Sequence, residues 1–578
     1  MHVIATAGHV DHGKSTLVRA LTGMEPDRLA EERRRGLTVD LGFAWTALAG
    51  EELAFVDVPG HERFVPNMLA GTGPAPAVMF VVAADEGWQA QSTEHLAALE
   101  AFGVRHGLLV VTKCDRADPA AATAVAGERF AEGGLAGVRA VAVSGRTGVG
   151  LPELRAALLA LAAELPVPDT TADVRLWVDR AFTIRGAGTV VTGTLGAGTI
   201  RVGDELVLAG RRVSVRGLQA LGRPHDEVRA VARVAVNLRG VDRRHVRRGD
   251  ALLTPSAWRL TREVDVRLRG DAAADLHRTL VLHVGAAATP CRVRPLGTDS
   301  ARLSLAAGLP LRAGDTGLLR DPGEHRIPDG VEIVDPCPPP LTGRGAARTR
   351  AEELAAAARA HVRRHGAVRA ADLRVLGWSP TGIRIGDWVV DEALHRDLPG
   401  RITARFTAWS AADPVAAGMP VEVLRREVGV PRPVLLAALA ETELTVHNGL
   451  VWAGDSGPSL PETVARPLAE VETRLAAEPF GAPESAYLAE LGLGPRELAA
   501  AERAGRLVRL TGSVVLAPDA PARAAEVLAA LPSPFTVGDA RRALGTTRRV
   551  AVPLLEHLDA NGVTRRHDDG TRTMRRGD

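Results

Sequence analysis

Lysine is nearly absent from this sequence. Of its 71 basic residues, only Lys14 and Lys113 are lysines, and all the others are arginines. Lysine carries a compact charge on a flexible stem, whereas arginine presents a wide planar fork. The chain uses arginine wherever either cation would serve. The two retained lysines therefore indicate sites that need the smaller charge.

Cysteines, long apolar runs and net charge are also scarce. The 3 cysteines, Cys114, Cys291 and Cys337, lie far apart without CxxC spacing, which favours free thiols over disulfides or a zinc site. The apolar runs are shorter than the roughly 20 residues of a membrane span. The N-terminus has no basic region before its apolar stretch, so it does not resemble a signal peptide. A net charge of +2 indicates no nucleic-acid binding by the surface as a whole. We expect a cytoplasmic monomer without membrane contact.

The N-terminal residues contain a phosphate-binding pattern. Residues 8–15, GHVDHGKS, fit GxxxxGK[ST] between an expected strand at 2–7 and an expected helix at 16–21. Backbone N–H groups of such a loop wrap phosphates, its lysine reaches the β- and γ-phosphates, and its serine hydroxyl ligates Mg²⁺. This role explains the first retained lysine. The predicted loop residues are Gly8, His9, Val10, Asp11, His12, Gly13, Lys14, Ser15 and Thr16.

A second motif, DVPGH at 57–61, follows an expected strand at 52–56. Asp57, at the strand end, can hold Mg²⁺ through water, and the N–H group of Gly60 can approach a γ-phosphate. His61 can orient an attacking water, although a lone histidine is more often an ordinary surface residue. Thr38 fits a switch residue that ligates Mg²⁺ only while a γ-phosphate is bound. Ser15, Thr38 and Asp57 are the predicted metal ligands.

Two further motifs indicate a preference for guanine. Each follows an expected strand, at 107–111 and at 139–143. Asp115 can accept hydrogen bonds from N1–H and N2–H of guanine, donors that adenine does not offer together. Backbone N–H groups at 144–146 can face guanine O6. The predicted guanine contacts are Thr112, Lys113, Asp115, Ser144, Gly145 and Arg146.

Taken together, GHVDHGKS, RGLT at 35–38 and DVPGH resemble the translational GTPases such as elongation factor Tu. The resemblance implies that His61 positions the hydrolytic water, that Asp11 supports this arrangement, and that the ribosome stimulates hydrolysis. It also implies a hydrophobic gate formed by Val10 and Leu37. One departure is Thr112, where the family usually has asparagine, and this puts the strength of guanine discrimination in question.

Short alternating strands with glycine turns follow the proline-marked residues 165–168. Strands expected between 174 and 238 predict one small β-barrel, and a strand-rich block at 263–335 predicts a second. Both barrels can be plain spacers. Residues 179–194, however, resemble the second domain of factors that carry aminoacyl-tRNA. Over nearly its whole length, including 27–29 and 36–42, the chain most resembles the selenocysteine-specific elongation factor family, SelB.

The SelB resemblance implies a pocket for the aminoacyl group. In that family it is lined by an Asp-Arg or Asp-His pair and a further arginine, which match Asp179, Arg180 and Arg233. A selenol is far more acidic than a thiol or hydroxyl. Arginine donors can therefore select its anion over serine or cysteine. The alternative is that these residues form surface ion pairs of the barrel.

The last third of the chain, from about residue 344, repeats helices followed by a hairpin. The expected hairpins lie at 444–452, 507–516 and 563–574, with turns at Asn448-Gly449, Thr511-Gly512 and Asp569-Gly570. Such a repeat predicts a tandem winged-helix array. The final unit is locally basic, which is typical of phosphate binding, although a solvated charged face is the alternative. Its predicted RNA-binding residues are Arg541, Arg542, Arg548, Arg549, Arg565, Arg566 and Arg572.

The whole sequence thus predicts a multidomain fold: an α/β P-loop GTPase domain, two β-barrel domains and a C-terminal α+β winged-helix array. Their expected bounds are 1–168, 172–258, 262–336, 344–402, 403–456, 457–519 and 520–578. With GTP/GDP and Mg²⁺ as cofactors, the resemblance implies delivery of selenocysteyl-tRNA to the ribosome at UGA codons. The last unit would bind the mRNA hairpin, or SECIS. The alternatives are a general aminoacyl-tRNA elongation GTPase and a non-catalytic, GTP-binding winged-helix regulator.

Overall fold

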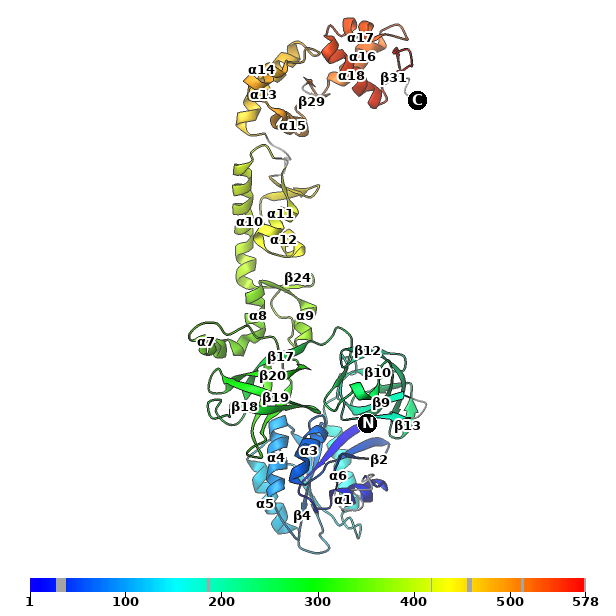
Figure 1. The fold of residues 1–578 in the computed structure, drawn as a ribbon, viewed down its shortest axis with the longest axis vertical. Coiled ribbons are helices and arrows are strands. Elements are labelled where there is room, and N and C mark those ends of the chain that lie inside the picture. The colour runs from blue at the N-terminus through cyan, green and yellow to red at the C-terminus, as the bar shows by residue number, and fades with distance from the viewer. Residues whose placement is uncertain (27–37, 185–187, 417, 455–459, 511–513, 576–578) are drawn as a thin grey trace. The chain divides into compact units, whose positions relative to one another are not determined.

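The structure, a computed structural model, describes residues 1–26, 38–184, 188–416, 418–454, 460–510 and 514–575 (Figure 1). It divides into one compact unit of residues 1–361 and 370–380 and a second of residues 362–369 and 381–578. Leu37, the residues 27–29 and the turn at Thr511-Gly512 lie outside the described ranges. Within those ranges, no helix is long and apolar enough to cross a membrane.

The first unit begins with a six-stranded sheet in the order β2-β3-β1-β4-β5-β6. Strand β2 is antiparallel to β3, and all other neighbours are parallel. The strands are β1 (His2–Ala7), β2 (Gly42–Leu48), β3 (Glu51–Asp57), β4 (Ala77–Ala83), β5 (His106–Thr112) and β6 (Arg139–Ala142). This confirms the predicted α/β fold, and each predicted motif follows a strand at the carboxyl edge of the sheet, where ligands of such sheets bind.

Helices cover both faces of this sheet, which explains why its central strands are apolar throughout. Every residue of β4, AVMFVVA, is buried, as expected for a parallel strand covered on both sides. Two separate apolar cores result, one on each face. The helices are α1 (Lys14–Thr22), α3 (Val65–Thr72), α4 (Ala90–Phe102), α5 (Ala120–Ala131) and α6 (Leu151–Glu164).

Two β-barrels follow, as the strand pattern predicts. In the first, the order β11-β16-β7-β9-β15-β12 closes because β11 also pairs with β12, and β8 pairs with β9 outside this ring. Its strands include β7 (Arg175–Trp177), β8 (Arg180–Ile184), β9 (Gly188–Leu195), β11 (Glu205–Leu208), β12 (Arg211–Ala220), β15 (Ala232–Arg239) and β16 (Ala251–Leu253). Alternate side chains of β15 point into the core, giving the burial pattern that the alternating sequence predicts.

The second barrel is closed in the order β17-β20-β19-β18-β21-β22. Its strands are β17 (Leu260–Leu268), β18 (Thr279–Val284), β19 (Ala287–Pro295), β20 (Ser300–Pro310), β21 (Thr316–Asp321) and β22 (Arg326–Asp335). The next helix, α7 (Ala346–Glu353), is anchored to the barrel by buried Arg350, which donates a 2.7 Å hydrogen bond to Asp265 and also contacts Asp335. Removing either partner would leave an uncompensated buried charge, so these contacts favour attachment of the helix to the barrel.

The second unit repeats helices followed by antiparallel strands, in agreement with the predicted winged-helix array. Strands β27 (Leu444–His447) and β28 (Leu450–Ala453) form the first predicted hairpin. Its turn residues Asn448 and Gly449 have φ of 50° and 76°, as a two-residue type I′ turn requires. Strands β29 (Val508–Arg509) and β30 (Val515–Leu516) form the second.

The last hairpin joins β31 (Thr564–Arg566) to β32 (Arg572–Met574) through a longer connection than its Asp-Gly sequence predicts. The N–H group of His567 donates to the carbonyl of Thr571, and the side chain of Asp569 accepts from the N–H group of Thr571. The aspartate thus shapes a wider loop instead of a two-residue turn. Helices α16 (Ala520–Ala529), α17 (Val537–Ala543) and α18 (Arg548–Ala560) precede this hairpin.

Candidate functional site

The predicted phosphate loop connects β1 to α1 and is shaped by residues with positive φ. Asp11 and Gly13 have φ of 61° and 86°, and a Cβ on Gly8 would lie 2.1 Å from the carbonyl oxygen of Val81. Lys14 Nζ donates hydrogen bonds to the carbonyls of Gly8 and His9, at 3.0 and 2.7 Å. The lysine therefore curls back over its own loop, an arrangement that suits its compact charge on a flexible stem.

A cavity of about 220 Å³ lies at this loop. It is lined by Val10, Asp11, Gly13, Lys14, Ser15, Thr16, Arg19, Glu25, Thr38 and Gly60. The structure thus brings the first and second predicted motifs and Thr38 together. Gly60 is crowded against the loop, because a Cβ there would lie 2.3 Å from Lys14 Nζ and 2.6 Å from the backbone nitrogen of Val10.

Three hydroxyl and carboxylate groups meet beside this cavity. Ser15 Oγ donates to Asp57 Oδ2 at 2.6 Å and lies 3.0 Å from Thr38 Oγ1. The other oxygen of Asp57 accepts from Thr6 Oγ1 at 2.8 Å, which fixes the carboxylate. Asp57 and Thr38 are buried. Oxygen donors of this kind suit Mg²⁺, so the three predicted ligands fit such an ion.

Of the predicted catalytic pair, one residue lines the cavity and the other does not. Asp11 lines it and is exposed, whereas His61 is half-buried and is not among the lining residues. The His61 ring lies 6.0 Å from that of Phe64, and its Nδ1 accepts from the N–H group of Arg63 at 3.2 Å. In this structure His61 is therefore held by its own loop.

Histidines beneath the loop form a feature that the sequence did not reveal. His95, on α4, is buried, and its Nδ1 accepts the N–H group of Gly8 at 3.0 Å. Burial, with a smaller effect of the Lys14 charge, lowers the pKa of His95 to about 3. Burial likewise lowers the pKa of His12 to about 4. Both rings are therefore neutral at pH 7 and add no positive charge beneath the loop.

The predicted guanine residues come together at the ends of β5 and β6. The hydroxyl of Thr112 donates to the carbonyl of His12 at 2.6 Å, so this residue links the third motif to the phosphate loop. A hydrogen bond with buried Ser144 lowers the pKa of Asp115, which is exposed. A Cβ on Gly145 would lie 3.3 Å from Thr16 Cγ2, which places residues 144–146 next to α1.

Lys113, the second retained lysine, has a left-handed backbone with φ of 56°. Its Nζ forms ion pairs with Asp85 at 3.3 Å and Glu86 at 2.5 Å. The compact ammonium group thus reaches two carboxylates of the neighbouring loop after β4. This tether holds the third motif in place.

The three predicted aminoacyl-pocket residues lie in the first barrel, close to β2. Arg233, on β15, binds the carboxylate of Asp179 with both terminal nitrogens, the Nη2 to Oδ1 distance being 2.7 Å. Thr192 donates a further hydrogen bond of 2.7 Å to Asp179. The side chain of Asp179 is only 4% exposed and that of Arg233 12%, whereas that of Arg180 is 32% exposed. The first two therefore form a buried pair, and Arg180 remains accessible.

Sequence reasoning missed three residues that complete this cluster. Arg180 Nη2 donates to Asp40 Oδ2 at 2.9 Å, and Arg248 Nη2 donates to Asp40 Oδ1 at 2.6 Å. The guanidinium carbons of Arg233 and Arg180 lie 3.9 and 5.4 Å from the ring centroid of Phe43. We call Asp40, Phe43, Asp179, Arg180, Arg233 and Arg248 the arginine cluster. Its three guanidinium groups face two carboxylates, which leaves one positive charge in excess.

The predicted RNA-binding arginines fall into two groups. Arg541, Arg542, Arg548, Arg549, Arg565 and Arg566 are exposed, although Arg549 also donates to the carbonyls of Ala482 and Pro483. Arg572 is buried and donates to Asp559 at 2.9 Å. The structure therefore places Arg572 in the packing of the last unit and not on its exposed face.

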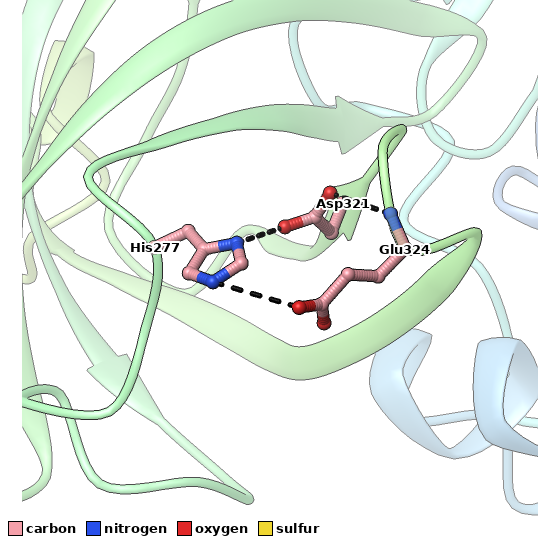
Figure 2. Close-up of side chains that lie close together, drawn as sticks. All are labelled: His277, Asp321 and Glu324. Carbon is pink, nitrogen blue, oxygen red and sulfur yellow. Dashed lines mark hydrogen bonds and ion pairs between the residues drawn. The ribbon is translucent and has the colours of Figure 1, made fainter.

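A separate titratable cluster lies on the second barrel (Figure 2). His277 Nδ1 lies 2.5 Å from Asp321 Oδ2, and its Nε2 lies 3.6 Å from Glu324 Oε1. Backbone N–H groups of Gly323 and Glu324 donate to the other oxygen of Asp321. Arg326 donates to the remaining oxygen of Glu324 at 2.7 Å. Arg326 already binds Glu324, so this group, in which Asp321 is buried and the other two residues are exposed, is explained as a polar network at the β21–β22 connection.

Family models match three parts of the chain. "Elongation factor Tu GTP binding domain" matches residues 1–164, "Elongation factor Tu domain 2" matches 188–253, and "Elongation factor SelB, winged helix" matches 526–573. The first two domains and the site geometry together define the class of the protein. The chain is a translational GTPase that binds guanine nucleotides.

Individual relatives narrow this class. The selenocysteine-specific elongation factor of Escherichia coli (strain K12) is 36% identical over 438 residues, which cover 73% of this chain and 69% of that protein. That of Desulfomicrobium baculatum is 45% identical over 260 residues, covering 44% of this chain and 41% of that protein. A crystal structure of bacterial selenocysteine-specific elongation factor EF-Sec superposes with a TM-score of 0.76 and 26% identity over 100% of both chains. The chain belongs to the selenocysteine-specific elongation factor family.

Proposed function

We propose that this protein carries selenocysteyl-tRNA to the ribosome and releases it when bound GTP is hydrolysed. The arginine cluster is the observation that carries this proposal. Its excess positive charge lies on a barrel matched by the elongation factor Tu domain 2 family, next to a guanine-nucleotide site. A general elongation factor has no need of an anion-selective pocket, and the winged-helix units would be unexplained.

GTP binding is attributed to the carboxyl edge of the sheet. Lys14 neutralises the β- and γ-phosphates, and Asp115 selects guanine. Ser15, Thr38 and Asp57, whose oxygens converge at 2.6 and 3.0 Å, would hold Mg²⁺. That ion would offset negative charge on the phosphates. The crowding of Gly60 against Lys14 suits an N–H group that approaches the terminal phosphate closely.

Hydrolysis is attributed to His61, supported by Asp11. His61 would orient the attacking water by hydrogen bonding. Its ring is held by Arg63 and lies near Phe64, and it does not line the nucleotide cavity. We expect the side chain to turn toward the cavity when it acts. Such a movement would make hydrolysis depend on an external trigger, the ribosome.

Selenocysteine selection is attributed to Arg180, with Arg233 in a supporting role. Arg233 already uses both terminal nitrogens on Asp179. The described contacts of Arg180 are made through Nη2, so its Nη1 and Nε are the donors for an anion. A selenolate carries the charge that these donors stabilise, whereas the seryl hydroxyl is neutral. The pocket thus distinguishes the two by charge.

Binding of an mRNA hairpin is attributed to the final winged-helix unit. Its exposed arginines, Arg541, Arg548, Arg565 and Arg566, come from α17, α18 and β31. Several arginines on one small unit suit a phosphate backbone. Recognition of a SECIS hairpin at UGA codons, a cytoplasmic location and a monomeric state remain predictions.

Filter binding with selenocysteyl-tRNA and its seryl precursor tests the main proposal. With GTP bound, we expect a much higher affinity for the selenocysteyl form, and with GDP bound a reduced affinity for it. The two ligands share one tRNA, so any difference between them reports on the aminoacyl group. Equal affinities for both ligands with GTP bound would contradict the proposal.

A further inference from the structure

The segment that contains Thr38 continues directly into the arginine cluster. Thr38 Oγ1 lies 3.0 Å from Ser15 Oγ in the phosphate loop. One residue later, the carbonyl of Val39 accepts from Asn67 Nδ2 at 2.8 Å, which fixes the segment against α3. Asp40 follows. Because Asp40 is two residues from Thr38, the contacts that hold this segment also constrain Asp40.

The carboxylate of Asp40 binds two arginines of the first barrel, one with each oxygen. Arg248 donates to Oδ1 at 2.6 Å, and Arg180 donates to Oδ2 at 2.9 Å and to the carbonyl of Leu41 at 3.0 Å. The carboxylate of Asp40 thus holds both guanidinium groups.

Arg248 extends the connection to the buried pair. Its Nε donates to the backbone carbonyl of Asp179 at 2.7 Å, and its Nη1 donates to Asn67 Oδ1. A single guanidinium group thereby joins the segment after Thr38, helix α3 and the start of β8. Arg248 and Arg180 thereby connect Asp40 to the predicted aminoacyl pocket.

We propose that Asp40 is a positioning residue that couples the nucleotide state to the selenocysteine pocket. The inference rests on the proposed function and adds its regulation. While Thr38 stays at the phosphate loop, Asp40 orients Arg180 and leaves Nη1 and Nε for the selenolate. When Thr38 leaves after hydrolysis, Asp40 leaves with it. Arg180 and Arg248 then lose their common carboxylate, the pocket loses its shape, and the aminoacyl group is released.

Simple charge counting makes the opposite prediction. Asp40 is an anion near an anion site, so its removal alone would strengthen selenolate binding in every nucleotide state. A positioning role instead predicts that removing Asp40 weakens selenolate binding. The loss should occur only with GTP bound, when Asp40 is in place. The sign of the effect in the GTP and GDP states therefore separates the two explanations.

The test compares the full-length wild type with Asp40→Asn, by filter binding of selenocysteyl-tRNA and seryl-tRNA in GTP and GDP. We expect Asp40→Asn to lower the affinity for selenocysteyl-tRNA about tenfold with GTP bound, close to the lower limit for one hydrogen bond to a charged group. Affinity with GDP bound, affinity for seryl-tRNA and affinity for GTP should stay unchanged. Asp40→Glu, which keeps the carboxylate, should recover part of the loss.

Asp173→Asn is the matched control, because Asp173 forms a 2.7 Å ion pair with Arg312 in the same unit, outside the arginine cluster. It should leave all the affinities unchanged. Equal losses with GTP and GDP for Asp40→Asn, or tighter binding in both, would overturn the coupling role. Failure of the proposed function is recognised separately, since the wild type itself would then not distinguish selenocysteyl-tRNA from seryl-tRNA.

Discussion

Arg233 binds the carboxylate of Asp179 with both terminal nitrogens in the wall of the first barrel. Because both side chains are mostly buried, this ion pair cannot be broken without leaving a charge unpaired. We expect Arg233→Gln to lower the free energy of unfolding by about 3 kcal/mol, the typical cost of removing one partner of a buried pair. Urea denaturation measures this effect.

Arg180→Gln gives the contrast within the same cluster. Its side chain is 32% exposed, so we expect a stability loss below about 1 kcal/mol. Both substitutions should abolish the preference for selenocysteyl-tRNA, and exposed Arg244→Gln serves as the control for lost charge. A large stability loss for Arg180→Gln, with selectivity retained, would contradict the assignment and give Arg180 a structural role.

Gly60→Ala tests the close approach of the second motif to the phosphate loop. The added Cβ would lie 2.3 Å from Lys14 Nζ, so either the loop or the lysine must shift. We expect GTP affinity to fall at least about tenfold, which equals roughly 1.4 kcal/mol. GDP affinity should change less, because Gly60 serves the terminal phosphate.

Gly127→Ala, on α5, is the matched control for the lost glycine. A Cβ there meets nothing within 4 Å, and an alanine within a helix should stabilise the domain by about 0.5–1 kcal/mol. Isothermal titration of both variants with GTP and GDP makes the comparison. Unchanged GTP affinity in Gly60→Ala would refute the assignment of Gly60.

His95 makes the stability of the GTPase domain depend on pH. Its folded-state pKa of about 3 lies below the unfolded value of about 6.5, so the unfolded chain binds the proton more readily. The contribution of neutral His95 to the free energy of unfolding is complete above a pH of about 6.5. It is lost as the pH falls toward the folded-state pKa, by up to about 1.4 kcal/mol per pH unit.

His95→Gln removes the titratable ring and keeps an oxygen that can accept a hydrogen bond from the N–H group of Gly8. Unfolding free energies at two pH values, one near neutrality and one mildly acidic, should therefore differ less in the variant than in the wild type. The remaining slope includes His12 and His283, whose pKa values burial also lowers to about 4. An identical slope in both proteins would contradict a neutral, buried His95.

RNA binding by the last unit should depend on its exposed arginines. Arg548→Ala and Arg565→Ala should each weaken binding of an RNA hairpin and reduce the slope of log affinity against log salt by about 1. Arg572→Ala should act on folding instead, because Arg572 is buried against Asp559. Arg523→Ala, on α16, removes an equal charge outside the predicted set. A salt slope that responds equally to Arg523 and Arg548 would refute a localised interface.

Much of the fold follows from local sequence patterns. The P-loop and the strand before each motif were predicted within a few residues, because periodicity and glycine positions act locally. Both barrels were predicted as blocks of short strands, but β16 (Ala251–Leu253) lies beyond the strands expected in the first barrel. The Asn448-Gly449 turn was predicted for the same reason. The wider loop at Asp569-Gly570 was not, since the side-chain hydrogen bond of Asp569 competes with the two-residue turn.

The arginine cluster could be predicted only in part. Asp179, Arg180 and Arg233 were found through a resemblance, but Asp40 and Arg248 were not, because they are 208 residues apart in the chain and carry no motif of their own. His95 was missed likewise, as a helical histidine indicates nothing until its contact with Gly8 is known. Long-range pairs between domains need the packed structure.

Selection of the selenolate by charge is the central claim, and a pH series tests it most directly. The affinities of the GTP complex for the selenocysteyl, cysteinyl and seryl forms of the same tRNA would be measured over a pH range. That range spans the ionisation of the cysteine thiol, at a pH of about 8.5. We predict that the cysteinyl form approaches the affinity of the selenocysteyl form as its thiol ionises, while the seryl form stays weak. If the affinities for the cysteinyl and seryl forms changed in parallel over the whole pH range, selection by charge would be contradicted.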